Sequence, residues 1–134
     1  MSQRISGGGF VPHTRDLIES PAMRVLSGAG LKVLQRIELE HLRHGGRDNG
    51  RLVVPYEDFI AYGIRHFRTV SRGLREAEAL GLIEIRRGHG GHGHARPNLY
   101  RLTYLPADNL GPTDEWRKFA TLAEAKAQLN GIFR

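Results

Sequence analysis

The apolar positions of residues 29–46 fit the stripe of an amphipathic α-helix. These positions are Leu31, Leu34, Ile37 and Leu42. Side chains three or four residues apart share one face of a helix, so the pattern predicts a long helix here, and Gly45 can end it. A short helix is expected just before it, because Ser20 can serve as N-cap and Pro21 suits the first helical position.

A second long helix is predicted over residues 65–81, after a short helix over residues 55–63. Its apolar face combines Phe67, Val70, Leu74 and Ala77, spaced three, four and three residues apart. At about 100° per residue, the opposite face carries Arg65, Arg68 and Arg72, with Arg75 beside them. Gly81 stops this helix. No acidic residue lies between Arg65 and Arg75, so a contact with DNA explains this face better than a solvated surface does.

Two alternating segments follow, "LIEIRR" at 82–87 and "NLYRLTY" at 98–104. In the second, Leu99, Arg101 and Thr103 point one way, and Tyr100, Leu102 and Tyr104 point the other. The glycine- and histidine-rich stretch "GHGGHGHARP" at 88–97 joins them, which predicts an antiparallel hairpin with a long loop. "RLVV" at 51–54 is a candidate for a third strand.

The order of these elements predicts an α+β fold. Helix, strand, helix, turn, helix, strand, long loop and strand is the order of a winged helix-turn-helix, whose wing would be residues 88–97. We expect a two- to three-stranded antiparallel wing sheet within a DNA-binding domain over residues 10–106. Residues 1–9, which include three consecutive glycines, are expected to form a disordered N-terminal tail.

Residues 107–134 predict an additional C-terminal helical segment. Thr121 and Glu124 have the spacing of a capping box, and Trp116, Phe119 and Leu122 follow one another at intervals of three. These apolar side chains require a buried environment. Two alternatives stay open: the segment closes the core of the domain, or it forms the interface of a homodimer, since helix-turn-helix proteins commonly bind paired half-sites as dimers.

Composition adds a basic charge to this picture. The 134 residues suit one domain, and 20 Lys and Arg minus 14 Asp and Glu give a net charge of +6. Arginine suits phosphate and guanine contacts, although a GC-rich genome would also enrich it. Cysteine is absent, which excludes disulfides, and no signal peptide or long apolar run is evident. We expect a soluble cytoplasmic protein located at the nucleoid, with no membrane partner.

The stretch "YGIRHFRTVSRGLREAEALGLIEIRR" resembles the helix-turn-helix and first wing strand of winged-helix bacterial regulators. The similar positions are a turn at Gly63 and Ile64, a helix start at Thr69–Arg72, and the apolar series Leu74, Ala77, Leu80, Leu82 and Ile83. Residues 10–106 are similar, more loosely, to small winged-helix proteins of bacterial chromosomes, phages and plasmids, including replication-initiator-like ones. Arg65 departs from the pattern by replacing a Ser or Thr cap, and Ala77 by replacing a leucine.

The predicted DNA-binding residues come from two places. The first is the helix with its preceding turn, which would lie in the major groove, and the second is the wing, which would contact the backbone or the minor groove. The residues are Arg65, His66, Arg68, Thr69, Ser71, Arg72, Arg75, Arg87, His89, His92, His94 and Arg96.

The three wing histidines, His89, His92 and His94, have a spacing that could ligate a metal. Zinc needs about four ligands held rigidly, and a glycine-rich loop supplies no such support, so we expect no metal and no cofactor. Glu38 and Glu40 are interpreted as ordinary helix-surface residues. No nucleophile elbow, phosphate-binding loop or dinucleotide motif is present, so we expect neither enzymatic activity nor a small-molecule substrate.

The sequence therefore predicts a sequence-preferring double-stranded DNA-binding protein, a bacterial transcriptional regulator. Two alternatives remain. A replication-initiator-like or nucleoid-associated protein would use the same surface but bind one origin or broad regions of DNA. A winged-helix protein–protein adaptor would show no salt-sensitive binding to DNA.

Overall fold

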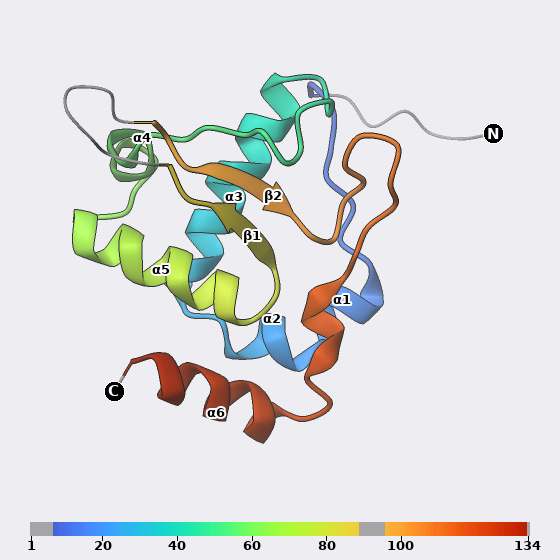
Figure 1. Ribbon diagram of the computed structural model, residues 1–134, viewed down its shortest axis with the longest axis vertical. Helices are drawn as coiled ribbons and strands as arrows, with labels where there is room; N and C mark the ends of the chain where they lie inside the picture. Colours follow the sequence, from blue (N-terminus) through green and yellow to red (C-terminus); the bar gives the residue numbers. More distant parts are fainter. Residues whose placement is uncertain (1–6, 89–95, 134) are drawn as a thin grey trace.

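The computed structural model describes residues 7–88 and 96–133, and within them the fold is α+β (Figure 1). It contains six α-helices, one 3-10 helix and a two-stranded antiparallel sheet. In chain order these are α1 (Arg15–Glu19), α2 (Pro21–Val25), α3 (Gly28–Arg43), α4 (Tyr56–Ala61), α5 (Phe67–Ala79), β1 (Ile83–Arg86), β2 (Leu99–Leu102), η1 (Glu115–Lys118) and α6 (Leu122–Ile132). This order is compatible with the predicted winged helix. No helix of the described ranges has the length and apolar character needed to cross a bilayer.

Local capping explains where the N-terminal helices begin and end. The Ser20 hydroxyl accepts a hydrogen bond of 3.1 Å from the backbone N–H of Met23, and Pro21 occupies the first turn of α2, so the predicted cap is confirmed. Ser27 caps α3 in the same way through the N–H of Gly30. The helix α3 ends at Arg43, and Gly45 follows with a φ of 65°.

The predicted antiparallel hairpin is confirmed, and its register places Ile85 of β1 opposite Tyr100 of β2. Tyr100 and Leu102 point into the core, as the alternation predicts. The candidate strand at 51–54 is reduced to an isolated bridge between Leu52 and Tyr100, because Pro55 already caps α4 three residues later. The sheet is therefore a two-stranded ribbon with one additional bridge at its edge.

The core lies between α3, α5 and the hairpin. Both predicted helix stripes bury their middle positions, with Leu34 and Ile37 from α3 and Val70, Leu74 and Ala77 from α5. The prediction is wrong for the first residue of each stripe, because Leu31 is 42% exposed and Phe67 is 54% exposed. Both stand in the first turn of their helix, and in α3 the inner face at this point is formed by the buried Gly30 and Val33.

The C-terminal segment packs against the same core. Trp116 and Phe119 are buried in the main hydrophobic cluster, Leu122 is half-buried, and α6 contacts α2 and α5. Gly81 permits this arrangement: its φ is 76°, and a Cβ there would lie 2.7 Å from the backbone of Glu115. The two large aromatic side chains therefore close the core of this chain. A homodimer stays a prediction.

The helical pattern of this segment is interrupted once. The 3-10 helix η1 ends at Lys118, and α6 starts anew after Thr121. The Thr121 hydroxyl accepts from the N–H of Glu124 at 3.1 Å, as in a capping box, but the Glu124 carboxylate accepts from the N–H of Ala120 at 3.0 Å. The reciprocal bond is thus displaced by one residue toward the N-terminus.

Glu38 is buried, so its interpretation as a surface residue is wrong. Its carboxylate accepts hydrogen bonds from the hydroxyl of Tyr104 and from His13, whose Nε2 lies 2.8 Å away. These bonds attach both the N-terminal segment and the end of the hairpin to α3. A buried carboxylate is costly unless it is hydrogen-bonded in this way.

His41 leads to an expectation about acid stability. It is buried near the end of α3, its Nδ1 has no hydrogen-bond partner among the described atoms, and burial lowers the pKa of its imidazole while the nearby Glu38 raises it less. A group whose pKa is lower in the folded state costs stability as the pH falls below its unfolded value of about 6.5. The variant His41→Leu should therefore lose less stability than the parent between about pH 7.5 and about pH 5.5 in urea unfolding experiments.

His44 provides a control of opposite sign. Hydrogen bonds to Asp48 and Glu40 raise the pKa of His44, so its stabilising contribution is present at low pH and is lost as the pH rises through the folded pKa. The variant His44→Gln should become more acid-sensitive than the parent. Equal acid sensitivity of the parent and His41→Leu would contradict the expectation for His41.

Candidate nucleic-acid interface

The turn between α4 and α5 is held by three residues with distinct roles. Gly63 adopts a φ of 121°, a backbone conformation that residues with a side chain rarely adopt, so this position favours glycine. Ile64 is buried and anchors the turn to the core. His66 is the N-cap of α5 in an extended conformation and makes no side-chain cap hydrogen bond. Arg65, expected on the helix itself, therefore stands in the turn before it.

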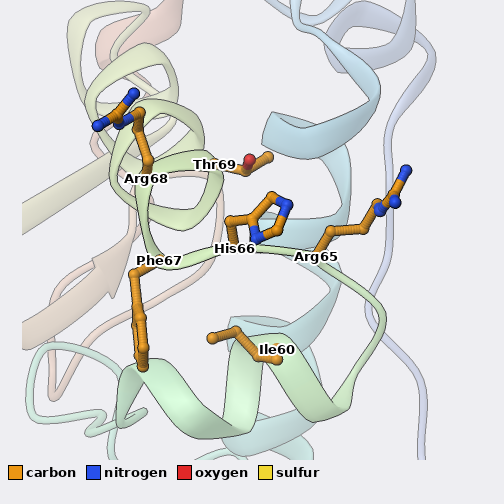
Figure 2. A pocket seen from close by; sticks show the side chains of 6 residues that line it. All are labelled: Ile60, Arg65, His66, Phe67, Arg68 and Thr69. Carbon is orange, nitrogen blue, oxygen red and sulfur yellow. The ribbon is translucent and has the colours of Figure 1, made fainter.

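An open hollow of about 600 Å³ lies between α4 and the first turn of α5 (Figure 2). Its lining residues are Ile60, Arg65, His66, Phe67, Arg68 and Thr69. Figure 2 shows Arg65 and Arg68 diverging to opposite sides, with His66 and Thr69 between them. The turn thus spreads its positive groups across the surface.

Lys32 extends this surface from α3. It lines a second hollow of about 470 Å³ together with Gly63, Arg65, His66 and Thr69, and its Nζ donates to the carbonyl oxygen of Gly63 at 3.4 Å. Lys32 is not among the residues that the sequence predicts for this surface. A lysine on the outer face of a helix has no distinctive local pattern, and only the packing of α3 against α5 places it beside the turn.

The C-terminal end of the chain contacts the opposite end of the same surface. The ring of Phe133 lies under two guanidinium groups, 4.1 Å from that of Arg72 and 5.1 Å from that of Arg75. Arg75 also donates to the carbonyl oxygen of Ile132 at 2.8 Å. These side chains line a third hollow of about 570 Å³ with Tyr56, Phe67, Arg68 and Ser71. Phe133 and Tyr56 are therefore members of the site beyond the predicted residues.

The cations of this surface lack acidic partners. Among residues 7–88 and 96–133, no carboxylate forms an ion pair with Lys32, Arg65, Arg68, Arg72 or Arg75, whereas six other arginines are paired and the remaining unpaired cations, such as Arg24, Arg43 and Lys126, lie outside this surface. The paired residues are Arg15, Arg36, Arg51, Arg87, Arg101 and Arg117. The two nearest acids on α5 are used elsewhere: Glu76 is buried and accepts from the N–H of Ser27, and Glu78 binds Arg87. The positive charge of the surface is thus left unneutralised.

The predicted residues of the helix and its turn come together, and those of the wing only in part. Arg65, His66, Arg68, Thr69, Ser71, Arg72 and Arg75 line adjoining hollows on one surface. Arg87 instead binds Glu78 through two hydrogen bonds of 2.7 and 2.9 Å. Arg96 is exposed at the base of the hairpin, where the N–H of Gly88 donates to Asn98. The three wing histidines, His89, His92 and His94, lie outside the described residues.

No three His, Asp or Glu side chains within the described ranges converge in a way suited to a metal ion. The chain matches no protein-family model, no curated protein and no solved structure in comparisons with known proteins. The functional interpretation therefore depends on the geometry and charge of the surface itself.

Proposed function

We propose that the protein is a sequence-preferring double-stranded DNA-binding protein of the winged helix-turn-helix type that acts as a bacterial transcriptional regulator. The observation that carries the proposal is the group of five cations along α5 and beside the turn before it that have no carboxylate partner in the described part of the chain. Unpaired cations gathered on one face attract the phosphates of DNA and release their counterions on binding.

The shape of this surface also favours the proposal. The major groove admits one α-helix, and α5 exposes Arg68, Arg72 and Arg75 along its outer face. The first backbone N–H groups of α5 are not occupied by a side-chain cap, and such groups at a helix N-terminus attract anions. Together these features suit a helix that enters the groove with its N-terminal end toward the bases.

The cations near the turn differ in their surroundings. Lys32 and Arg65 flank the turn on the side of α3, a position suited to phosphates beside the groove. Arg68 is exposed in the first turn of α5, where helix-turn-helix proteins contact base edges. The wing, with Arg96 and the loop histidines, would contact the backbone or the minor groove.

A replication-initiator-like or nucleoid-associated role would use the same contacts, and the distribution of binding sites along the genome distinguishes these roles.

Salt dependence tests the proposal directly. If one protomer neutralises about 4–6 phosphates, the slope of log affinity against log salt should be roughly −3.6 to −5.4, at about 0.9 counterions per contact. Fluorescence anisotropy with labelled random duplexes over a range of salt concentrations would measure this slope. The variant Lys32→Ala should reduce its magnitude by about one unit.

Arg15→Ala is the matched control for Lys32→Ala, because it removes the same charge from α1, where Arg15 pairs with Glu19, and should leave the slope unchanged. Binding that does not respond to salt would overturn the proposal and favour a protein–protein adaptor.

A further inference from the structure

Phe67 is an exposed aromatic side chain at the centre of the cationic surface. It is 54% exposed at the first position of α5. It lines both the hollow beside the turn and the hollow that contains Arg72, Arg75 and Phe133. Figure 2 shows its side chain extending from the start of α5 toward α4. Phe67 and Arg68 therefore form a ridge between these two hollows.

The ring of Phe67 is fixed by a series of aromatic contacts that begins in the core. Buried Phe59 meets Tyr56 edge to face, with centroids 6.3 Å apart. Tyr56 in turn stacks on Phe67, with centroids 6.3 Å apart and an interplanar angle of 24°. Such pairs hold aromatic rings in defined orientations. The exposed part of Phe67 is thus a preorganised apolar surface among unpaired guanidinium groups.

Within the proposed function, this apolar surface has one matching group. The edges of base pairs in the major groove present hydrogen-bond donors and acceptors, and the only apolar group among them is the 5-methyl group of thymine. Against any other base edge, a phenylalanine at the first helical position would displace water from polar groups and leave their hydrogen bonds unreplaced. Contact with the methyl group removes apolar surface of both partners from water.

We propose that Phe67 is a specificity-determining residue that selects thymine through its 5-methyl group; this inference rests on the proposed DNA-binding function. Arg68 on the same ridge is free to contact the neighbouring base or phosphate. The prediction is a preference for thymine over an otherwise identical pyrimidine that lacks the methyl group, at the base that Phe67 meets.

The experiment compares thymine with deoxyuridine, which differ only by that methyl group. Duplexes that bind the parent are first selected from a pool with a random centre, and the best duplex is then remade with deoxyuridine in place of each thymine in turn. The parent should lose about fourfold in affinity at one thymine position, the factor expected for one buried methyl group. Phe67→Ala should bind both forms of the duplex equally, and Phe67→Leu should retain part of the preference.

Two features keep the outcome interpretable. The ratio of affinities is measured within each variant, so a change in folding stability that affects both duplexes equally cancels. Ile18→Ala is the matched control, because Ile18 is 55% exposed but lies on α1, and it should keep the full ratio. The inference is overturned if the parent does not distinguish thymine from deoxyuridine at any position, or if Phe67→Ala keeps the parent's ratio. Salt-insensitive binding of every duplex would instead overturn the proposed function itself.

Discussion

Replacing Arg68 and Arg72 together by alanine should weaken DNA binding at least tenfold while leaving the protein folded. Both side chains are exposed on α5 and have no acidic partner among the described residues. An arginine that binds guanine through two hydrogen bonds contributes roughly 1–3 kcal/mol of discrimination against other bases. An arginine that binds phosphate instead contributes equally on all sequences, and its loss lowers the salt slope by about one unit. Titrations of each single variant on selected and random duplexes distinguish these two roles.

The two arginines should differ in their effect on folding. Arg68 makes no ion pair within the described chain, so Arg68→Ala should change the free energy of unfolding by no more than about 0.5 kcal/mol. Arg72 lies over the ring of Phe133, and an exposed cation–π contact is worth about 0.5–1 kcal/mol. Thermal melts, measured alongside the DNA titrations, would separate the effect of each substitution on stability from its effect on binding. If both single variants bound every duplex as the parent does, α5 would not be the DNA-reading helix.

Leu74→Ala should have the opposite effect and destabilise the protein by about 2–5 kcal/mol through a cavity in the core. Leu74 is 2% exposed and lies on the inner face of α5, where α5 packs against α3. Loss of this side chain removes apolar contacts that the surrounding backbone cannot readily replace. Urea unfolding monitored by circular dichroism would measure the change.

Leu31→Ala is the matched control, because it makes the same substitution in the first turn of α3 at a position that is 42% exposed. It should destabilise the protein much less than Leu74→Ala does. Equal effects of the two substitutions would mean that α3 and α5 do not pack as described. Where Leu74→Ala is still folded at low temperature, its DNA affinity should stay close to that of the parent, since Leu74 does not reach the exposed surface.

The helices of this protein could be predicted because helix formation depends on residues close in the chain. The spacing of Val70, Leu74 and Ala77 identifies the inner face of α5, and Ser20 with Pro21 identifies the start of α2. The alternation of Tyr100 and Leu102 identifies the inner face of β2. Each of these signals arises from contacts within a few residues, and the sequence displays such contacts directly.

The exposed face of α5 could be predicted for the same reason. The spacing predicts Arg68 and Arg72 opposite the apolar stripe and Arg75 beside them, and all three are exposed. Arg65 was expected on the same face but lies in the turn, because the helix begins one residue after the N-cap His66. Boundaries of helices are harder to predict than their faces, since a single capping residue decides them.

Which side chains of that face keep an unpaired charge or an exposed ring was decided only by the tertiary structure. Glu78 lies on α5 and Arg87 directly follows β1, and only the packing of β1 against α5 lets them pair. Lys32 reaches the turn before α5 from α3, and Phe133 reaches the outer face of α5 from the end of α6. Phe67 stacks on Tyr56 of α4 and keeps 54% of its side chain exposed. Periodicity determines which residues of one helix face outward. Which of those residues keep a free charge or an exposed ring depends on groups far away in sequence, because electrostatic and packing interactions act through space and only the folded chain brings these groups together.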